Sequence, residues 1–383
     1  MTLVTGMLLN AVKNKPEDKK LAFFIATASG PCRLGQYEVY MKDLIKKRRI
    51  PDVAIFSLSS GASYSGLGKD FQKRMWIGTL VADAFEDMRS MIQVNASDKR
   101  AALSVLDEQW CNVLTGLEAD SIRSLFSRFR SAADTLARIA LKKPIDDIPV
   151  ISLVGEIFVR RDSFSRRFLV QRLAELGFAV SCAPVAEWFF YIDLMLSKGY
   201  LKKKLSKIER LEAMYRKNFM LSHEREIQAI FKTTGLYKGH PVEIGKVIEQ
   251  GTRYIGMDLG GEGILTVGSS LVNIAESACG VIAIGPFGCM PNRISESILS
   301  RAMTSHEKNN ACRNNKHLSD ILALQDHLPF LAIESDGRPF PQMIEAKLEP
   351  FLLRANRLHS LMLQKNGTAK PNRNSRRLIH RTL

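Results

Sequence analysis

Two cysteines of this 383-residue chain follow glycine–proline pairs in loops that we expect to end strands. Residues 29–32 (SGPC) follow the apolar run 20–28, and residues 285–289 (GPFGC) follow the apolar run 280–284. A Gly-Pro pair makes a tight loop, and the helix predicted behind it offers free N–H groups and a partial positive charge. That field favours the thiolate that a metal or redox site requires. Cys32 and Cys289 are therefore candidate metal or redox ligands, the alternative being two small packing residues in tight loops.

The other four cysteines lack this setting. Cys182 ends a predicted strand without a Gly-Pro loop, Cys279 ends a predicted helix, and Cys111 and Cys312 lie in helical or polar stretches. There is no C-x-x-C pair, which argues against a zinc ribbon or a ferredoxin-type cluster, and no Walker A lysine loop. The glycine-rich stretch 257–263 (MDLGGEG) resembles a phosphate loop but has no convincing strand before it and no lysine, and it is either a direct nucleotide site or, preferred over that, a helix entry loop that touches a ligand.

Alternating apolar runs and helical patterns predict the elements that carry these residues. Apolar runs at 20–28 and 51–58 flank an amphipathic stretch at 36–47, which indicates a parallel crossover. Residues 75–142 have helical periodicity, and 142–149 (KKPIDDIP) resemble a linker. Further strands are predicted at 149–154, 177–182, 280–285 and 329–333, and helices at 163–176, 187–240, 263–278, from 291 and at 342–361. The pattern predicts an α/β protein with two doubly wound parallel-sheet domains and a helical insertion.

Charged residues follow several of these strands, where open parallel sheets bind ligands. They are Glu156, Arg160, Glu187, Glu334 and Asp336. Their functional interpretation is that they orient a cofactor or substrate, and the alternative is helix capping and loop closure.

The formal net charge is +16, and two segments carry most of it. Residues 198–217 and the tail 364–383 each have a net charge of +6. The first segment is predicted to be a solvated helix face, and the tail a flexible basic end. This distribution makes nucleic acid an unlikely partner, with a basic anion or nucleic-acid binder kept as an alternative function. No apolar run suits a membrane span and no signal peptide is evident, so we expect a cytoplasmic protein with reduced cysteines.

Five co-linear stretches resemble the 2-hydroxyacyl-CoA dehydratase subunit superfamily, and within it the dehydratase-like half of long CoA-enzyme activase-related proteins. They are residues 29–37 (SGPCRLGQY), 154–160 (VGEIFVR), 183–188 (APVAEW), 285–292 (GPFGCMPN) and 333–341 (IESDGRPFP). The resemblance implies Rossmann-like domains around a crevice that holds a 4Fe-4S-type iron–sulfur cluster. By position it makes Cys32 and Cys289 cluster ligands.

The chain departs from this family in two respects. Members usually have a further ligand cysteine upstream, so Cys279 or Cys182 substitutes for it, a separate chain supplies it, or the cluster is absent. The ATPase half of the long proteins also has no counterpart here, which suggests a fragment of a split system.

We therefore expect an iron–sulfur electron-transfer protein that a partner activase-type ATPase reduces, with an acyl-CoA or another small molecule as substrate. Glu156, Arg160, Glu187 and Asp336 are the candidate catalytic residues. The expected domains are 1–145, 146–362 and a flexible tail at 363–383. A non-catalytic scaffold that docks a longer activase- or dehydratase-like partner is the main alternative.

Overall fold

The computed structural model describes residues 1–27, 32–59, 68–200, 206–239, 241–274, 276–311 and 316–365. Contacts divide the chain into two compact units, Met1–Trp76 with Ile192–Ser206 and Ile77–Tyr191 with Lys207–Leu383. The boundary predicted near residue 145 falls inside the second unit. The predicted tail lies outside the described residues from residue 366 onward.

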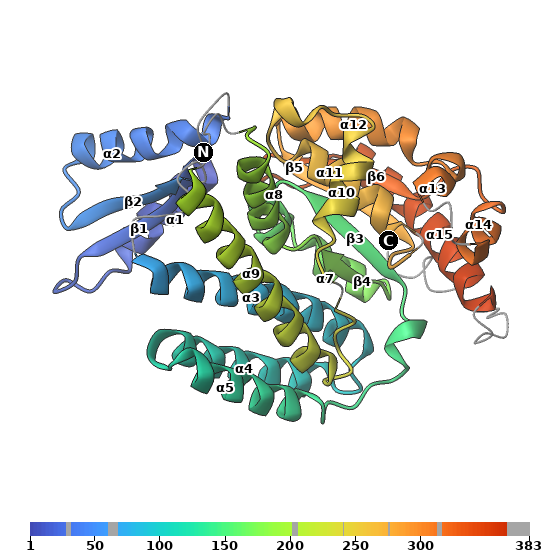
Figure 1. Cartoon of the computed structure of the whole chain (residues 1–383), viewed down its shortest axis with the longest axis horizontal. Helices are drawn as coiled ribbons and strands as arrows, with labels where there is room; N and C mark the ends of the chain where they lie inside the picture. Colours follow the sequence, from blue (N-terminus) through green and yellow to red (C-terminus); the bar gives the residue numbers. More distant parts are fainter. Residues whose placement is uncertain are drawn as a thin grey trace. The chain divides into compact units, whose positions relative to one another are not determined.

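The first unit contains a parallel strand pair, as the sequence pattern predicted (Figure 1). Its elements are α1 (Thr2–Lys13), β1 (Leu21–Thr27), η1 (Arg33–Gln36), α2 (Tyr37–Arg48) and β2 (Val53–Ser59). Leu8 of α1, Ile25 of β1 and Met41 of α2 form its small buried core. Both helices therefore pack their apolar residues against the strand pair.

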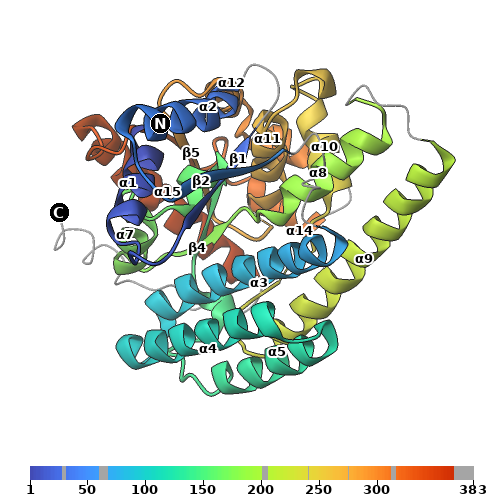
Figure 2. The same cartoon turned by 90° about the vertical axis from the view of Figure 1, so that its left-hand side faces the viewer.

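The second unit begins with the predicted helical segment. The long helix α3 (Gly68–Asn95) runs into this unit and is followed by α4 (Lys99–Ala119) and α5 (Ile122–Leu136). The helices α4 and α5 form a hairpin beside α3 (Figure 1, Figure 2). Asp98 caps the first turn of α4 and Ser121 that of α5, because each side chain accepts a hydrogen bond from a backbone N–H three residues later.

A four-stranded parallel sheet in the order β4-β3-β5-β6 forms the centre of the second unit. The strands are β3 (Val150–Gly155), β4 (Ala179–Cys182), β5 (Gly280–Pro286) and β6 (Phe330–Ser335). The chain passes from β3 to β4 on one side and then returns to β5 on the other side of β3. The strand order therefore reverses between β3 and β5, the place where open parallel sheets bind ligands.

Helices join and cover these strands. They are α6 (Ile157–Arg161), α7 (Leu169–Glu175), α8 (Ala186–Ser197), α9 (Lys207–Lys232), α10 (Ile244–Thr252), α11 (Gly263–Asn273), α12 (Met290–Ala302), α13 (Ser305–Ala311), α14 (Lys316–Leu322) and α15 (Gln342–Lys365), with short turns η3 (Ile145–Asp147) and η4 (Met257–Leu259). The helix α10 packs closely on α11 at Gly268, where a Cβ atom would lie 2.0 Å from the carbonyl oxygen of Val247.

The α/β class and the parallel strands are confirmed. The predicted helix at 163–176 is shorter in the structure, because Arg167 and Phe168 have positive φ and helix α7 begins only at Leu169. The predicted helix at 263–278 ends at Asn273. In the parts of the chain that the structure describes, no helix has the length and apolar character needed to cross a bilayer.

Candidate functional site

Both candidate ligand cysteines occupy the residue that immediately precedes a helix. Cys32 is the N-cap of η1, which continues directly into α2, and its side chain is exposed. Cys289 is the N-cap of α12 and is half-buried. Each has extended backbone angles and follows a parallel strand of its own unit. Because one cysteine belongs to each unit, their meeting across one crevice stays a prediction.

Cys182 and Cys279 have a different environment. Their side chains are buried, and each sulfur donates a hydrogen bond to a carbonyl oxygen, that of Arg160 for Cys182 and that of Val150 for Cys279. Burial raises the pKa of the Cys182 thiol, against the opposing effect of Arg161, and raises the pKa of Cys279 to about 12. Both thiols are therefore held in their neutral form. Cys111 is exposed, and Cys312 lies outside the described residues.

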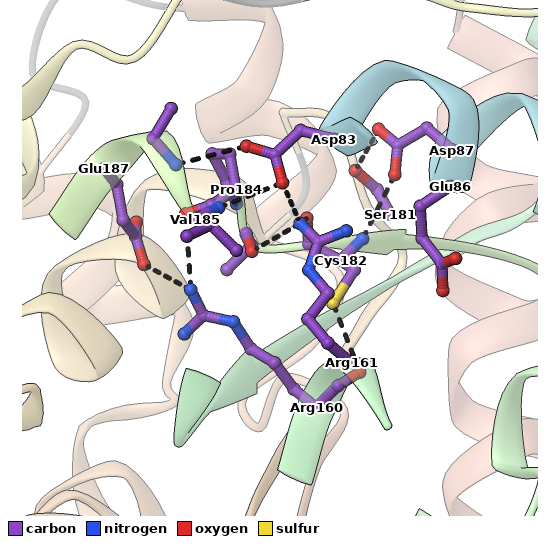
Figure 3. Close-up of polar contacts among 12 residues, drawn as sticks. Asp83, Glu86, Asp87, Arg160, Arg161, Ser181, Cys182, Pro184, Val185 and Glu187 are labelled. Atoms are coloured by element: carbon purple, nitrogen blue, oxygen red, sulfur yellow. Dashed lines mark hydrogen bonds and ion pairs between the residues drawn. The ribbon is translucent and has the colours of Figure 1, made fainter. Parts of the chain in front are cut away.

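A network of buried charges lies where β3 and β4 end (Figure 3). The consecutive arginines Arg160 and Arg161 of α6 both reach the segment after β4, where they donate to the carbonyl oxygens of Pro184 and Ala183. Arg160 donates to Glu187 at 3.4 Å, and Arg161 donates to Asp83 at 2.6 Å. Arg166 is also buried and contacts Glu86 of α3 at 2.7 Å. Paired charges of this kind hold α6, α8 and α3 together.

Side chains of α3 form hydrogen bonds with the edge strand β4. Asp87 accepts hydrogen bonds from the Cys182 N–H and the Ser181 hydroxyl, and Ser90 accepts one from the Val180 N–H (Figure 3 shows the first two). Strand β4 is the edge strand here, so these side chains satisfy backbone groups that would otherwise lack partners. Asp83 accepts hydrogen bonds from the N–H groups of Val185 and Ala186 at the start of α8.

Two carboxylates occupy the N-terminus of α6. Glu156 is the N-cap residue and accepts hydrogen bonds from the N–H groups of Phe158 and Val159. Glu262 accepts one from the N–H of Ile157. Burial raises the pKa of Glu262 to about 8, and the neighbouring charge of Glu156 acts in the same direction. The helix-capping interpretation of Glu156 therefore has direct structural support.

The loop after β5 contains an unsatisfied amide. The side chain of Asn292, in the first turn of α12, is buried with only 4% exposed. Neither its Oδ1 nor its Nδ2 has a hydrogen-bond partner within the described ranges. The side chain packs on Gly285 at the end of β5, where a Cβ atom would lie 2.5 Å from the Asn292 Cγ. A buried amide without partners is unusual, and a polar ligand would satisfy it.

The predicted glycine-rich entry loop lies against this helix start. A Cβ atom on Gly263 would lie 3.4 Å from the carbonyl oxygen of Pro291, and Ser295 of α12 donates a hydrogen bond to the Gly263 carbonyl. The start of α11 therefore packs on the first turns of α12, and contact of this loop with a ligand stays a prediction.

The two remaining predicted residues, Glu334 and Asp336, have different surroundings. Glu334 accepts a hydrogen bond from the N–H of Gly288 and lies 3.3 Å from Arg293, so it borders the Cys289 loop. Asp336 accepts a hydrogen bond from the Arg338 N–H in an exposed turn. Of the predicted residues, the structure thus gathers Glu156, Arg160 and Glu187 at the ends of β3 and β4 and leaves Asp336 apart from them.

Sequence reasoning missed Asp83, Glu86 and Asp87, as well as the role of Glu262. The spacing of the three acids, at i, i+3 and i+4 on one helix, is a signal for a shared face. The sequence contains no sign of what that face meets, since their partners lie about 80 to 100 residues away in the chain.

The second unit is thus a parallel α/β fold with a buried charge network at the carboxyl edge of its sheet. No protein-family model, curated protein or solved structure matches this chain. Among the described residues, no group of three or more His, Cys, Asp or Glu side chains has the arrangement of a metal site. Cys32 and Cys289 each fit a cluster ligand by chemistry and position, but the described residues of either unit do not make up a complete ligand set.

Proposed function

We propose that this chain is an iron–sulfur redox protein in which the thiolates of Cys32 and Cys289 are two of the cluster ligands. One observation carries the proposal. Both cysteines are N-cap residues of helices that follow parallel strands. Free N–H groups and the helix dipole at such a position stabilise a thiolate relative to a thiol.

The environments of the other cysteines support this choice of ligands. Cys182 and Cys279 are buried, and burial raises the pKa of both thiols, so we leave them out of the ligand set. A 4Fe-4S cluster takes four ligands. The proposal therefore includes a second polypeptide, or a part of the chain outside the described residues, as the source of the others.

The crevice between the ends of β3 and β5 is the proposed ligand position in a Rossmann-like second unit. The unsatisfied amide of Asn292 lies in the first turn of the helix that Cys289 caps. When bound, the cluster would supply one-electron chemistry at low potential, and an activase-type ATPase is the proposed electron donor. An acyl-CoA or related small molecule is the proposed substrate.

The charged residues at the strand ends have positioning roles in this proposal. Glu156 holds the N-terminus of α6, and Arg160 links α6 to the start of α8 through Glu187 and the carbonyl oxygen of Pro184. These contacts fix the loops that border the crevice.

Anaerobic purification followed by reconstitution with iron and sulfide tests the proposal. We expect a coloured protein that contains iron and acid-labile sulfide and absorbs visible light, as a thiolate-ligated cluster does. Cys32→Ser and Cys289→Ser should each lose most of the iron, sulfide and absorption. Cys111→Ser is the matched control, because Cys111 is exposed on α4 and should leave all three unchanged. Equal iron in all variants, or a metal-free wild-type protein under these conditions, would refute the proposal.

A further inference from the structure

A cavity of about 260 Å³ lies within the second unit, away from the loop of Cys289. Its walls come from α3, β4, the C-terminal half of α9, residues 236–239 and 241–243, and α11. Ligand sites are concave and have mostly apolar walls with a few polar groups. Leu80, Ile227 and Val247 supply apolar wall here, and carboxylates supply most of the charge.

The cavity has a strong excess of negative charge. Six carboxylates line it, and Lys238 is the single lysine or arginine among its described lining residues. Four of these acids have a cation nearby. Asp83 pairs with Arg161, Glu187 with Arg160, and Glu243 and Glu276 both lie within 4 Å of Lys246, at 3.3 and 3.8 Å. Asp87 and Glu224 form no ion pair with any described residue.

Glu224 is the more unusual of the two. Only 1% of this residue is exposed, and its Oε1 accepts a hydrogen bond from the Val242 N–H at 2.8 Å. No described residue donates to its other oxygen, Oε2, which is not among the fully enclosed polar atoms of the described residues and so is accessible from the cavity that Glu224 lines. A carboxylate oxygen that faces a cavity and accepts nothing from the surrounding protein is available to a donor on a ligand.

Asp87 faces the same cavity from α3. Its two oxygens accept hydrogen bonds from neutral donors, the Ser181 hydroxyl and the Cys182 N–H. Burial raises the pKa of Asp87 to about 7, with Arg161 acting in the opposite direction and Asp83 in the same one. Burial also raises the pKa of Glu224 to about 7, opposed by the Val242 N–H and by Arg225.

We propose that this cavity binds a small organic cation, an alkylammonium or diamine, with the carboxylates of Glu224 and Asp87 as its charged partners. A positive ligand would satisfy the Glu224 oxygen and offset the uncompensated charge of both acids. An organic cation fits better than a bare metal ion, since the described residues offer no group of three metal-binding side chains. The cavity volume of about 260 Å³ lies below the roughly 300 to 1,000 Å³ of pockets for drug-sized ligands, which suits a ligand of few atoms.

Tyr237 also lines the cavity. Burial raises the pKa of its phenol, and the charges of Asp87, Asp83 and Glu224 add to that effect. The phenol therefore stays neutral and lies close enough to these acids to sense their charge. A neutral phenol can accept a hydrogen bond from an ammonium group or stack against its alkyl chain.

Calorimetric titration of the full chain with 1,4-diaminobutane tests the proposal, and 1,4-butanediol is the uncharged control of equal length. We expect saturable binding of the diamine at pH 8 and none of the diol. At pH 6 a carboxyl group with a pKa of about 7 is roughly one-tenth ionised, so affinity should fall at least about tenfold.

Two variants distinguish diamine binding in the cavity from nonspecific attraction of the diamine to surface carboxylates. Glu224→Gln keeps the acceptor for Val242 but removes the charge, and it should weaken diamine binding at least about tenfold at pH 8. Glu226→Gln is the matched control, because Glu226 lies on the same helix with 45% of its side chain exposed, and it should leave binding unchanged. Far-UV circular dichroism confirms that each variant is folded.

Three results would overturn the proposal. They are no diamine binding at pH 8, equal binding of the diol, and unchanged binding by folded Glu224→Gln. The cavity does not include Cys32 or Cys289. The iron content of the chain therefore tests the redox proposal independently of this site.

Discussion

Removing the carboxylate of Asp83 should destabilise the second unit strongly. Only 11% of the Asp83 side chain and 18% of the Arg161 side chain are exposed. Asp83→Ala would leave the Arg161 guanidinium without its carboxylate and the N–H groups of Val185 and Ala186 without their acceptor. Breaking a buried ion pair costs about 3 to 5 kcal/mol. Arg161 keeps the carbonyl oxygen of Ala183 as a partner, so we expect about 3 kcal/mol.

Urea unfolding followed by circular dichroism measures this loss in the full chain. A double-mutant cycle with Asp83→Ala and Arg161→Met should give a coupling free energy above about 1.5 kcal/mol. The matched control is the Arg89–Asp107 pair, with 33% and 59% of the side chains exposed. Its coupling should stay below about 1 kcal/mol. If the two cycles gave the same small value, the charge network would not hold α3 against the sheet, and our account of it would be wrong.

Two other predictions concern pH and close packing. Because burial raises the pKa of Glu224 from 4.5 to about 7, the folded chain binds a proton there that the unfolded chain has lost. Stability should therefore fall as pH rises through this window, by up to about 3 kcal/mol from this residue. In urea unfolding at pH 5 and pH 8, Glu224→Gln should remove this part of the fall and leave the part due to Asp87, whose pKa burial also raises to about 7; an unchanged pH dependence would contradict this. Gly268→Ala should lower stability by more than about 2 kcal/mol, because its Cβ would overlap the Val247 carbonyl of the neighbouring helix. Gly245→Ala, with no atom within 4 Å of its Cβ, should instead be neutral or stabilising, and equal effects of the two would refute the packing argument.

The sequence predicted most of the architecture because its signals are local. Each predicted strand corresponds to an observed one to within about two residues, since apolar runs bounded by Gly and Pro mark strands well. The positions of Cys32 and Cys289 before helices were predictable for the same reason. Both are features of a few consecutive residues.

The features that the sequence did not predict depend on distant parts of the chain. The predicted helix at 163–176 begins late because Asp162 accepts hydrogen bonds from the Ser165 N–H and hydroxyl, and Arg166 reaches Glu86. A helical pattern cannot show that such a competing set of partners exists. The acids of α3 were missed for the same reason, since an acidic helix face most often meets water.

The starts of α6 and α12, which follow β3 and β5, differ in the hydrogen-bond donors that they leave available. At α6 the first three N–H groups already donate to Glu156 and Glu262, so this terminus has no free donors for an anion. At α12 the N-cap is a cysteine, and Asn292 carries a buried amide without a partner in the described ranges. A negatively charged or polar ligand at the reversal of strand order would therefore be held from the α12 side. The acids at α6 would meanwhile repel an anion from that terminus, which leaves the start of α12 as the better anion-binding end of the two.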